Sequence, residues 1–247
     1  MNKGREGLYM NTALIFAGGT GQRMNSKAKP KQFLELHGKP IIIYTIEIFE
    51  RHQEIDNIVV VCLKSWIDEF KSLLAKNNIH KVTCIVPGGE TGHESIYNGL
   101  QAISNNTKDD DIILIHDGVR PLVSEELISE NIQKVKEFGT CITVSKQVET
   151  VVEVNDDEKI IEVPNRDIVR IAKAPQSFYY KDIWKSYQMA EEEHILTIDS
   201  AQLMNHYGYE LHTVNCSPYN IKITSPSDFY VFRAIYEAIE NLQIFGL

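Results

Sequence analysis

The sequence predicts an α/β protein with a doubly wound, mostly parallel sheet and an inserted β-hairpin arm. Strand-like and helix-like segments alternate along most of the 247 residues, which is typical of a parallel sheet with helices on both faces. The runs Ile58–Leu63 and Ile112–Ile115 are wholly apolar, as expected for strands covered on both sides. Polar loops follow Ala17, Val86 and Ile115. Because ligands bind at the carboxyl ends of such strands, we expect the functional site where these loops meet.

The first half of the chain contains four strand–helix pairs. In the first helix, Ile41, Tyr44 and Ile48 recur at helical spacing. Ser124 is a typical N-cap, and acidic residues follow it in the first turn of the fourth helix. The strands are expected at Ala13–Ala17, Ile58–Leu63, Val82–Val86 and Ile112–Ile115, and the helices at Pro40–Arg51, Ser65–Asn77, Glu94–Ser104 and from Ser124 to Phe138.

The segment from Cys141 to Phe178 departs from this rhythm. Val148–Val154 and Lys159–Val163 flank a polar turn, which predicts a hairpin. Such an insert is either an addition to the sheet edge or an arm that packs on a partner. The pattern then resumes with helices at Lys181–Glu193, Asp199–Tyr207 and Ser227–Asn241 and a strand at Glu210–Asn215. We expect one domain over residues 1–247, with a disordered leader at 1–9 and the arm at about 143–170.

Composition narrows the class of partner. Hydrophobic residues make up 43% of the chain and charged residues 24%, as in soluble globular proteins. The net charge of -9 argues against nucleic acid and against an anionic membrane surface, although a local pocket can still take a small polyanion. The four cysteines form no CxxC pair, which favours free thiols in the cytoplasm. No apolar run approaches the roughly 20 residues of a membrane span.

A glycine-rich loop, Ala17-Gly18-Gly19-Thr20-Gly21-Gln22-Arg23-Met24, follows the first strand. Glycines allow backbone N–H groups to approach phosphate oxygens, and a nearby cation neutralises them. The loop is not a P-loop, because no Gly-Lys-Ser/Thr follows it. It is not a dinucleotide fingerprint either, because Met24 stands where the third glycine belongs. A flexible turn is the simpler alternative, but three glycines beside Arg23 favour a phosphate site.

A basic segment, Lys27-Ala28-Lys29-Pro30-Lys31-Gln32-Phe33, comes next. Lys27 and Lys29 are expected to be solvated surface residues. Lys31, fixed behind Pro30, is placed to direct an ammonium at a triphosphate. Charge stabilisation of this kind dominates phosphoryl transfer.

These two motifs open a series that resembles the sugar-alcohol phosphate cytidylyltransferases. That family includes the enzymes acting on methylerythritol 4-phosphate and on ribitol 5-phosphate. The resemblance covers nearly the whole chain in the family's order. Its later motifs are Gly88-Gly89, Ser95-Ile96-Tyr97-Asn98-Gly99-Leu100, His116-Asp117-Gly118-Val119-Arg120-Pro121, Pro164-Asn165-Arg166, Ala174-Pro175-Gln176-Ser177-Phe178 and Asn220-Ile221-Lys222-Ile223-Thr224. It implies a Rossmann-like nucleotidyltransferase sheet and an enzyme that joins CMP from CTP to a polyol phosphate and releases pyrophosphate.

The resemblance also assigns nucleotide contacts. It implies that Gly88, Gly89 and Ser95 contact cytosine and ribose. Arg23, Lys31 and Lys222 would be catalytic, the first two near the α-phosphate and Lys222 at the pentacoordinate phosphorus. The phosphates of CTP would lie in a cradle formed by Ala17, Gly18, Gly19, Thr20 and Gly21.

The metal and the acceptor are assigned in the same way. Asp117 would hold Mg²⁺, an ion that usually takes only one or two protein carboxylates. Arg120 would lie in the acceptor pocket. Arg166 and Thr150, on the arm, would reach the polyol phosphate of a second subunit, which implies a homodimer. The simpler alternatives are a turn aspartate, a salt bridge between Arg120 and Asp117, a surface lysine at Lys222 and a strand-forming threonine at Thr150. We expect His116 to be structural, because this chemistry needs no general base.

Departures from the family pattern guide the choice of acceptor. Gly92 stands where many members have an arginine, so the cytosine or ribose contact is less well supported there. The arm reads Glu149-Thr150-Val151-Val152 and lacks the lysine typical of methylerythritol-type members. The glycines Gly18 and Gly118, together with Tyr219 before Asn220, resemble the ribitol type. These features favour D-ribitol 5-phosphate.

Other functions stay open at this point. The nearest alternative is the same reaction on 2-C-methyl-D-erythritol 4-phosphate. A transferase for another nucleotide or a sugar 1-phosphate is more distant. A non-catalytic nucleotide-binding protein is disfavoured, because Arg23, Lys31, Asp117 and Lys222 are all present.

Overall fold

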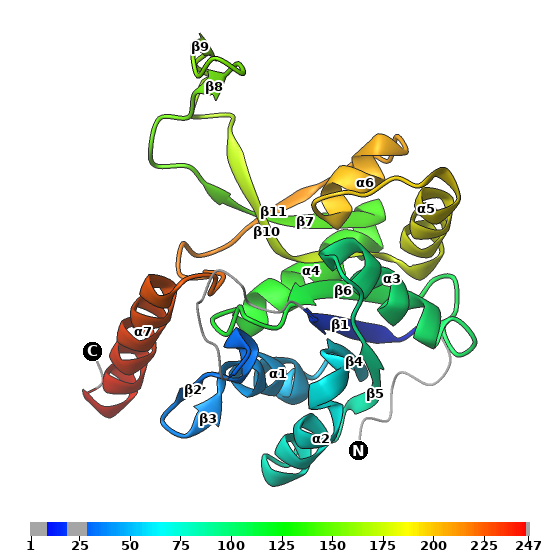
Figure 1. The fold of residues 1–247 in the computed structure, drawn as a ribbon, viewed down its shortest axis with the longest axis vertical. Coiled ribbons are helices and arrows are strands. Elements are labelled where there is room, and N and C mark those ends of the chain that lie inside the picture. Colours follow the sequence, from blue (N-terminus) through cyan, green and yellow to red (C-terminus); the bar gives the residue numbers. More distant parts are fainter. Residues whose placement is uncertain (1–8, 19–28, 246–247) are drawn as a thin grey trace.

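The apolar runs of the first half form the centre of a seven-stranded sheet (Figure 1). The computed structural model describes residues 9–18 and 29–245, with the side chains of the last helix up to residue 241. The strands β1 (Asn11–Ala17), β4 (Asn57–Cys62), β5 (Val82–Pro87) and β6 (Ile112–Asp117) are parallel, in the spatial order β6-β1-β4-β5. The polar loops at their carboxyl ends are therefore neighbours in space.

Helices cover both faces of this sheet. One face carries α1 (Ile41–Arg51), α2 (Ile67–Lys76) and α4 (Glu125–Phe138), and the other carries α3 (Gly92–Ile103), α5 (Tyr180–Glu193) and α6 (Ser200–His206). Alternate side chains of β1 enter the two resulting cores: Ala13 and Ile15 the first, Leu14 the second. The doubly wound, mostly parallel architecture is thus confirmed.

Helix starts follow the local signals closely. The Ser124 side chain accepts a hydrogen bond from Leu127 N, as an N-cap does. Thr91 and Glu94 form a capping box, so α3 begins at Gly92, two residues earlier than predicted. The helix α2 is preceded by a short 3-10 turn, η3 (Lys64–Trp66).

The second half of the chain contributes three strands to this sheet, and two of the three were not predicted. β7 (Thr140–Lys146) and β10 (Arg170–Tyr179) join the sheet, and β10 runs antiparallel between β7 and β6. β11 (Thr213–Asn215) pairs parallel with β7 and is shorter than the predicted Glu210–Asn215. The full order is β11-β7-β10-β6-β1-β4-β5.

The predicted hairpin exists, but its paired part is short. Only β8 (Glu153–Val154) and β9 (Ile160–Glu162) form its ladder, and Figure 1 shows them projecting from the body of the molecule. Because β7 extends to Lys146 and β10 starts at Arg170, residues 147–169 lie between these two strands and are called the arm from here on. The arm exposes apolar side chains, among them Ile161 at 64% and Ile168 at 78%.

Small elements complete the chain. The 3-10 turn η2 (Lys31–Phe33) leads to the two-stranded β2 (Glu35–Leu36) and β3 (Lys39–Pro40). The last helix, α7 (Pro226–Phe245), buries Phe232 against Tyr44 of α1.

Among the described residues no helix is both long and apolar enough to cross a membrane. All four cysteines are unbonded.

Candidate active site

Two adjoining cavities lie at the carboxyl ends of β1, β5 and β6. The first, of about 230 Å³, is lined by the loops after β1 and β5 and is called here the loop cavity. The second, of about 280 Å³, is bounded by β10 and the start of α6 and is called the β10 cavity. Both cavities are lined by Phe16, Gly92, Asp117 and Lys222. Molecules bound in the two cavities would therefore meet at Asp117 and Lys222.

The loop cavity depends on a close backbone contact between Gly18 and Gly88. A Cβ on Gly88 would lie 2.9 Å from the Cα of Gly18, and a Cβ on Gly18 would lie 2.8 Å from Oγ of Ser95. Side chains at these positions would force the two loops apart. Gly89 is equally confined, because its Cβ would lie within contact distance of the Glu94 side chain.

The first turn of α3 forms another wall of the loop cavity. Ser95 is buried, and its Oγ accepts a hydrogen bond of 3.2 Å from Gly89 N. The capping box of Thr91 and Glu94 fixes this turn. Ser95, Gly89 and Gly18 therefore line one surface.

Lys31 reaches the loop cavity from η2. Phe33 is fully buried and stacks on Trp66 with ring centroids 4.4 Å apart. Gln32 donates a 2.6 Å hydrogen bond to the carbonyl of Ala17. These two anchors on one short turn hold Lys31 beside the end of β1.

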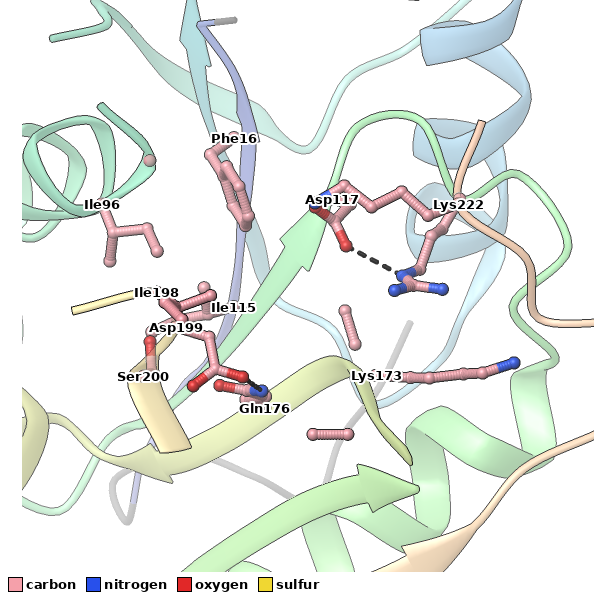
Figure 2. A pocket seen from close by; sticks show the side chains of 14 residues that line it. Phe16, Ile96, Ile115, Asp117, Lys173, Gln176, Ile198, Asp199, Ser200 and Lys222 are labelled. Carbon is pink, nitrogen blue, oxygen red and sulfur yellow. Dashed lines mark hydrogen bonds and ion pairs between the residues drawn. The ribbon is translucent and has the colours of Figure 1, made fainter. Parts of the chain in front are cut away.

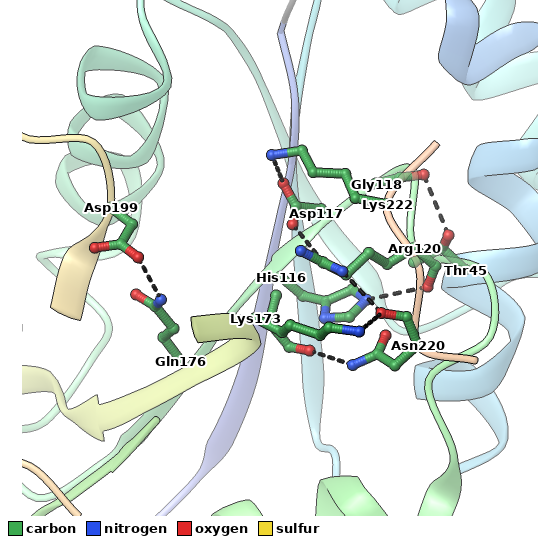
Figure 3. A network of polar contacts seen from close by, with 11 residues as sticks. Thr45, His116, Asp117, Gly118, Arg120, Lys173, Gln176, Asp199, Asn220 and Lys222 are labelled. Atoms are coloured by element: carbon green, nitrogen blue, oxygen red, sulfur yellow. Dashed lines mark hydrogen bonds and ion pairs between the residues drawn. The ribbon is translucent and has the colours of Figure 1, made fainter. Parts of the chain in front are cut away.

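Asp117 is the centre of the charged network drawn in Figure 3. Its Oδ1 lies 2.6 Å from Lys222 Nζ, and its Oδ2 accepts from Arg120 Nε at 2.8 Å. Burial raises the pKa of this carboxyl, but Lys222 and Arg120 outweigh that effect and lower the pKa to about 2. Asp117 is therefore a carboxylate at any physiological pH.

A second tier of contacts orients Arg120. Its NH1 donates 2.9 Å to the carbonyl of Asn220, which also accepts from Lys173 Nζ at 3.2 Å. His116 Nε2 lies 3.2 Å from the carbonyl of Arg120. Burial lowers the pKa of His116 to about 4, so the imidazole is neutral near pH 7 and serves packing. Lys173 is also half-buried, and burial lowers its pKa.

The opposite wall of the β10 cavity was not recognised in the sequence. It contains Gln176, whose Nε2 donates to Oδ2 of Asp199 at 2.9 Å. Gln176 belongs to a motif quoted for the resemblance, and Asp199 carries the signal of an N-cap. Neither signal reveals that the two residues meet, because that contact spans different elements. Lys173 was missed for the same reason.

The predicted site residues fall into three groups. The structure brings Ala17, Gly18, Lys31, Gly89, Ser95, Asp117 and Lys222 around the loop cavity, with Gly88 packed behind Gly18 and Arg120 on the β10 cavity. Gly19, Thr20, Gly21 and Arg23, like the predicted leader up to residue 8, lie outside the described residues. The third group, Thr150 and Arg166, is exposed on the arm and lines neither cavity, and Arg166 NH1 donates to the carbonyl of Val148.

Known proteins share this sequence and fold. The family model described as 2-C-methyl-D-erythritol 4-phosphate cytidylyltransferase (IspD) matches residues 11–238. A ribitol-5-phosphate cytidylyltransferase of Vibrio parahaemolyticus is 52% identical over 96% of this chain and 100% of its own. A 2-C-methyl-D-erythritol 4-phosphate cytidylyltransferase of Clostridium botulinum is 36% identical over 93% of this chain and 98% of its own.

A solved structure agrees with these sequence relatives. The crystal structure of the 4-diphosphocytidyl-2C-methyl-D-erythritol synthase of Anaerococcus prevotii is similar with a TM-score of 0.81 and 30% identity, over 93% of this chain and 96% of that one. The resemblance seen in the motifs is thus confirmed over more than nine-tenths of the chain. The chain belongs to the 2-C-methyl-D-erythritol 4-phosphate cytidylyltransferase (IspD) family and is a nucleotidyltransferase that uses CTP.

Proposed function

We propose that this enzyme transfers CMP from CTP to D-ribitol 5-phosphate and forms CDP-ribitol and pyrophosphate. The observation that carries this choice is the 52% identity, over the full length of that relative, to a protein named for ribitol 5-phosphate. The methylerythritol-type relative from Clostridium botulinum is 36% identical. Transfer to 2-C-methyl-D-erythritol 4-phosphate is the second candidate, which the name of the matching family and the Anaerococcus structure favour.

The reaction needs positive charge and alignment. An oxygen of the acceptor phosphate attacks the α-phosphorus of CTP, the bond from that phosphorus to the bridging oxygen breaks, and pyrophosphate leaves. The acceptor phosphate is itself the nucleophile, so no covalent nucleophile of the enzyme is required. Because both reactants are anions, fixed cations lower the barrier. The two adjoining cavities support this reading, because they allow CTP and acceptor to meet beside Lys222.

CTP is proposed to occupy the loop cavity. Backbone N–H groups around Gly18 can approach the phosphates because Gly18 lines the loop cavity and has no side chain to block them. Lys31 supplies charge near the α-phosphate, and Ser95 with Gly88 and Gly89 contacts ribose or cytosine. Gly19, Thr20, Gly21 and Arg23 complete the cradle in this proposal, on the strength of the sequence motif.

Lys222 is proposed to stabilise the pentacoordinate phosphorus. Its Nζ lies at the junction of the two cavities, on the segment that follows Asn220. The ion pair with Asp117 keeps the ammonium on that junction while leaving its remaining N–H groups for phosphate oxygens. Arg120, held by Asp117 and Asn220, adds charge on the acceptor side.

Asp117 is proposed to hold the Mg²⁺ that nucleotide chemistry requires. In the described part of the chain no cluster of three His, Cys, Asp or Glu forms a metal cage. A fully ionised carboxylate on the cavity fits Mg²⁺, which binds one or two protein carboxylates and completes its shell with phosphate oxygens and water. Bound Mg²⁺ would neutralise phosphate charge, and Asp117 retains lone pairs beyond those used by Lys222 and Arg120.

The arm is proposed to complete the site of a second copy of the chain. Its exposed apolar residues, such as Ile161 and Ile168, cost free energy in water unless a partner covers them. Arg166 and Thr150 lie on this arm and line neither cavity of their own subunit. In a homodimer they would reach the acceptor phosphate of the partner. The four unbonded cysteines are consistent with the reducing cytoplasm that we propose as its location.

Pyrophosphate release tests the proposal. The purified protein is incubated with Mg²⁺, CTP and either D-ribitol 5-phosphate or 2-C-methyl-D-erythritol 4-phosphate. We expect a higher kcat/KM with ribitol 5-phosphate, and CDP-ribitol as the product by mass spectrometry. Turnover with methylerythritol 4-phosphate alone would select the second candidate. Faster turnover with UTP or GTP than with CTP would reject the assignment of the nucleotide.

A further inference from the structure

The β10 cavity has two walls of different chemistry. Figure 2 shows Asp117 and Lys222 on one side and Asp199, with Gln176 beside it, on the other. The first wall suits a phosphate, because Lys222 and Arg120 both pair with Asp117 and together outweigh its charge. The second wall presents a carboxylate, which repels a phosphate but accepts hydrogen bonds from hydroxyl groups.

The carboxylate of Asp199 is held in one orientation. Its Oδ1 accepts from Gln202 N at 2.9 Å, which is its function as the N-cap of α6. Its Oδ2 accepts from Gln176 Nε2 at 2.9 Å. Gln176 is only 6% exposed and is fixed at its other end, because Oε1 accepts from Ala201 N at 2.9 Å. Capping of the helix requires a single oxygen of the carboxylate. The hydrogen bond from Gln176 to the other oxygen therefore has a separate effect, which is to fix the orientation of the carboxylate.

Asp199 is the carboxylate that this wall offers to a ligand. Of the described residues around it, Ile96, Ile198 and Ala174 provide no side-chain hydrogen bond. Ser200 is 1% exposed, and its hydroxyl is already paired with the hydroxyl of Tyr187 at 3.1 Å. A carboxylate has about four lone-pair sites, so Asp199 keeps capacity beyond its two protein contacts.

The reaction fixes which end of the acceptor faces this wall. The acceptor phosphate must lie at Asp117 and Lys222, because these residues also line the loop cavity where CTP is proposed to bind. The hydroxyl-bearing chain then extends across the β10 cavity toward Asp199. We propose that Asp199, oriented by Gln176, accepts hydrogen bonds from the acceptor's hydroxyls and selects for a long polyol chain. This inference rests on the proposed transfer to a polyol phosphate.

Replacement of the carboxylate tests this role while keeping the helix cap. Asn and Ser are both good N-caps, so Asp199→Asn and Asp199→Ser should fold. We expect the ratio of kcat/KM for ribitol 5-phosphate over glycerol 3-phosphate, which lacks the distal hydroxyls, to fall by about tenfold or more, as for the loss of a charged hydrogen bond. The KM for CTP should stay within about twofold of wild type, because the loop cavity is untouched. An unchanged ratio in a variant that melts like wild type would overturn the inference.

Gln176→Glu tests the positioning residue. Glu keeps an oxygen for Ala201 N but replaces the donor to Asp199 with a second carboxylate. We expect a higher KM for ribitol 5-phosphate with little change in the KM for CTP, whereas damage to the fold alone would raise both. Asp68→Asn is the matched control, because its side chain is 99% exposed on α2 and lines neither cavity.

The wild-type enzyme separates failure of this inference from failure of the proposed function. Absence of turnover with ribitol 5-phosphate in wild type would reject the proposed acceptor. The Asp199 variants would then be compared on methylerythritol 4-phosphate over glycerol 3-phosphate, where an unchanged ratio again contradicts the role of Asp199. A loss of turnover that is equal for both acceptors also contradicts it.

Discussion

Lys222 Nζ and Asp117 Oδ1 lie 2.6 Å apart, although the two residues are 105 positions apart in the chain. Asp117 ends a central strand, and Lys222 follows the segment that passes beside Arg120. Both residues line both cavities, so the charge that faces the reacting phosphates depends on two segments that are far apart in the chain.

Lys222→Ala should lower kcat by about 10²- to 10³-fold, the typical loss when one preorganised electrostatic group is removed. The reason is that the junction of the cavities loses its ammonium, while Asp117 keeps Arg120 and stays charged. Initial rates of pyrophosphate release at saturating CTP measure the effect. Lys76→Ala, at the exposed end of α2, is the control and should retain wild-type rates. Equal rates in both variants would remove Lys222 from the mechanism.

Asp117→Asn should reduce turnover and raise the Mg²⁺ concentration needed for half-maximal rate by about tenfold or more, because an amide oxygen is a weaker ligand for Mg²⁺ than a carboxylate. Chelation with EDTA should abolish wild-type turnover, and added Mg²⁺ should restore it. A variant with the wild-type Mg²⁺ dependence would show that Asp117 is only the partner of Lys222 and Arg120.

The stability of the wild-type protein should fall as the pH is lowered from about 6.5 toward 4, by up to about 3 kcal/mol from His116 alone. Burial lowers the folded-state pKa of His116 to about 4 from its ordinary 6.5. Between these values the unfolded chain binds the proton and the folded chain does not, so acidification favours unfolding. Urea unfolding at several pH values measures this slope. His116→Gln should flatten it, and an identical slope in both proteins would show that other groups cause it.

Gly88→Ala should destabilise the fold by about 1–3 kcal/mol and raise the KM for CTP, because the added Cβ would lie 2.9 Å from the Cα of Gly18. Urea unfolding and the CTP dependence of the rate measure the two effects. Gly92→Ala is the control for stability, since a Cβ there meets no atom within 4 Å and alanine favours the helix. Equal free energies of unfolding in both variants would contradict the proposed tight loop contact.

Co-expression of Arg166→Ala and Lys222→Ala chains should restore activity to about a quarter of wild type, if arms complete sites in trans. Random pairing gives about half heterodimers, and each has one site with both residues intact. Each variant alone should be weakly active. No recovery, with dimers confirmed by light scattering, would show that Arg166 acts within its own subunit or not at all.

If the chain forms the proposed dimer, Ile161→Asp should convert it to a monomer, because the substitution puts a charge on the apolar surface of the arm. Light scattering after gel filtration gives the molar mass. Leu196→Asp, equally exposed at 64% but away from the arm, should leave the mass unchanged. A monomeric wild type with full activity would reject the dimer.

The sequence was most informative where burial dictates composition. The central strands at Ile58 and Ile112 could be predicted because strands covered on both faces must be apolar. The mixed polarity of β10 hid it, since this antiparallel strand runs from the exposed arm at Arg170 into the core at Phe178. Its partner β7 is buried except at Lys146, but its Thr and Ser residues give it a mixed polarity that hides a buried strand.

Part of the candidate site could be predicted from the sequence. Loop glycines and Lys31 could be placed because their strand positions bring them to one edge of the sheet. The Asn220 carbonyl that holds Arg120, and Gln176 that holds Asp199, were not predictable. Such contacts depend on three-dimensional register between distant segments, which leaves no periodic pattern in the chain.

One strand, β10, connects the arm directly to the β10 cavity. The strand leaves the arm at Arg170 and reaches the β10 cavity at Ala172–Gln176, where its register with β7 shifts. The loops of the loop cavity belong to other strands, β1 and β5. We therefore expect an isolated subunit to bind CTP as the proposed dimer does but to bind the acceptor more weakly. Dimer formation would then be required for binding of the second substrate and not of the first.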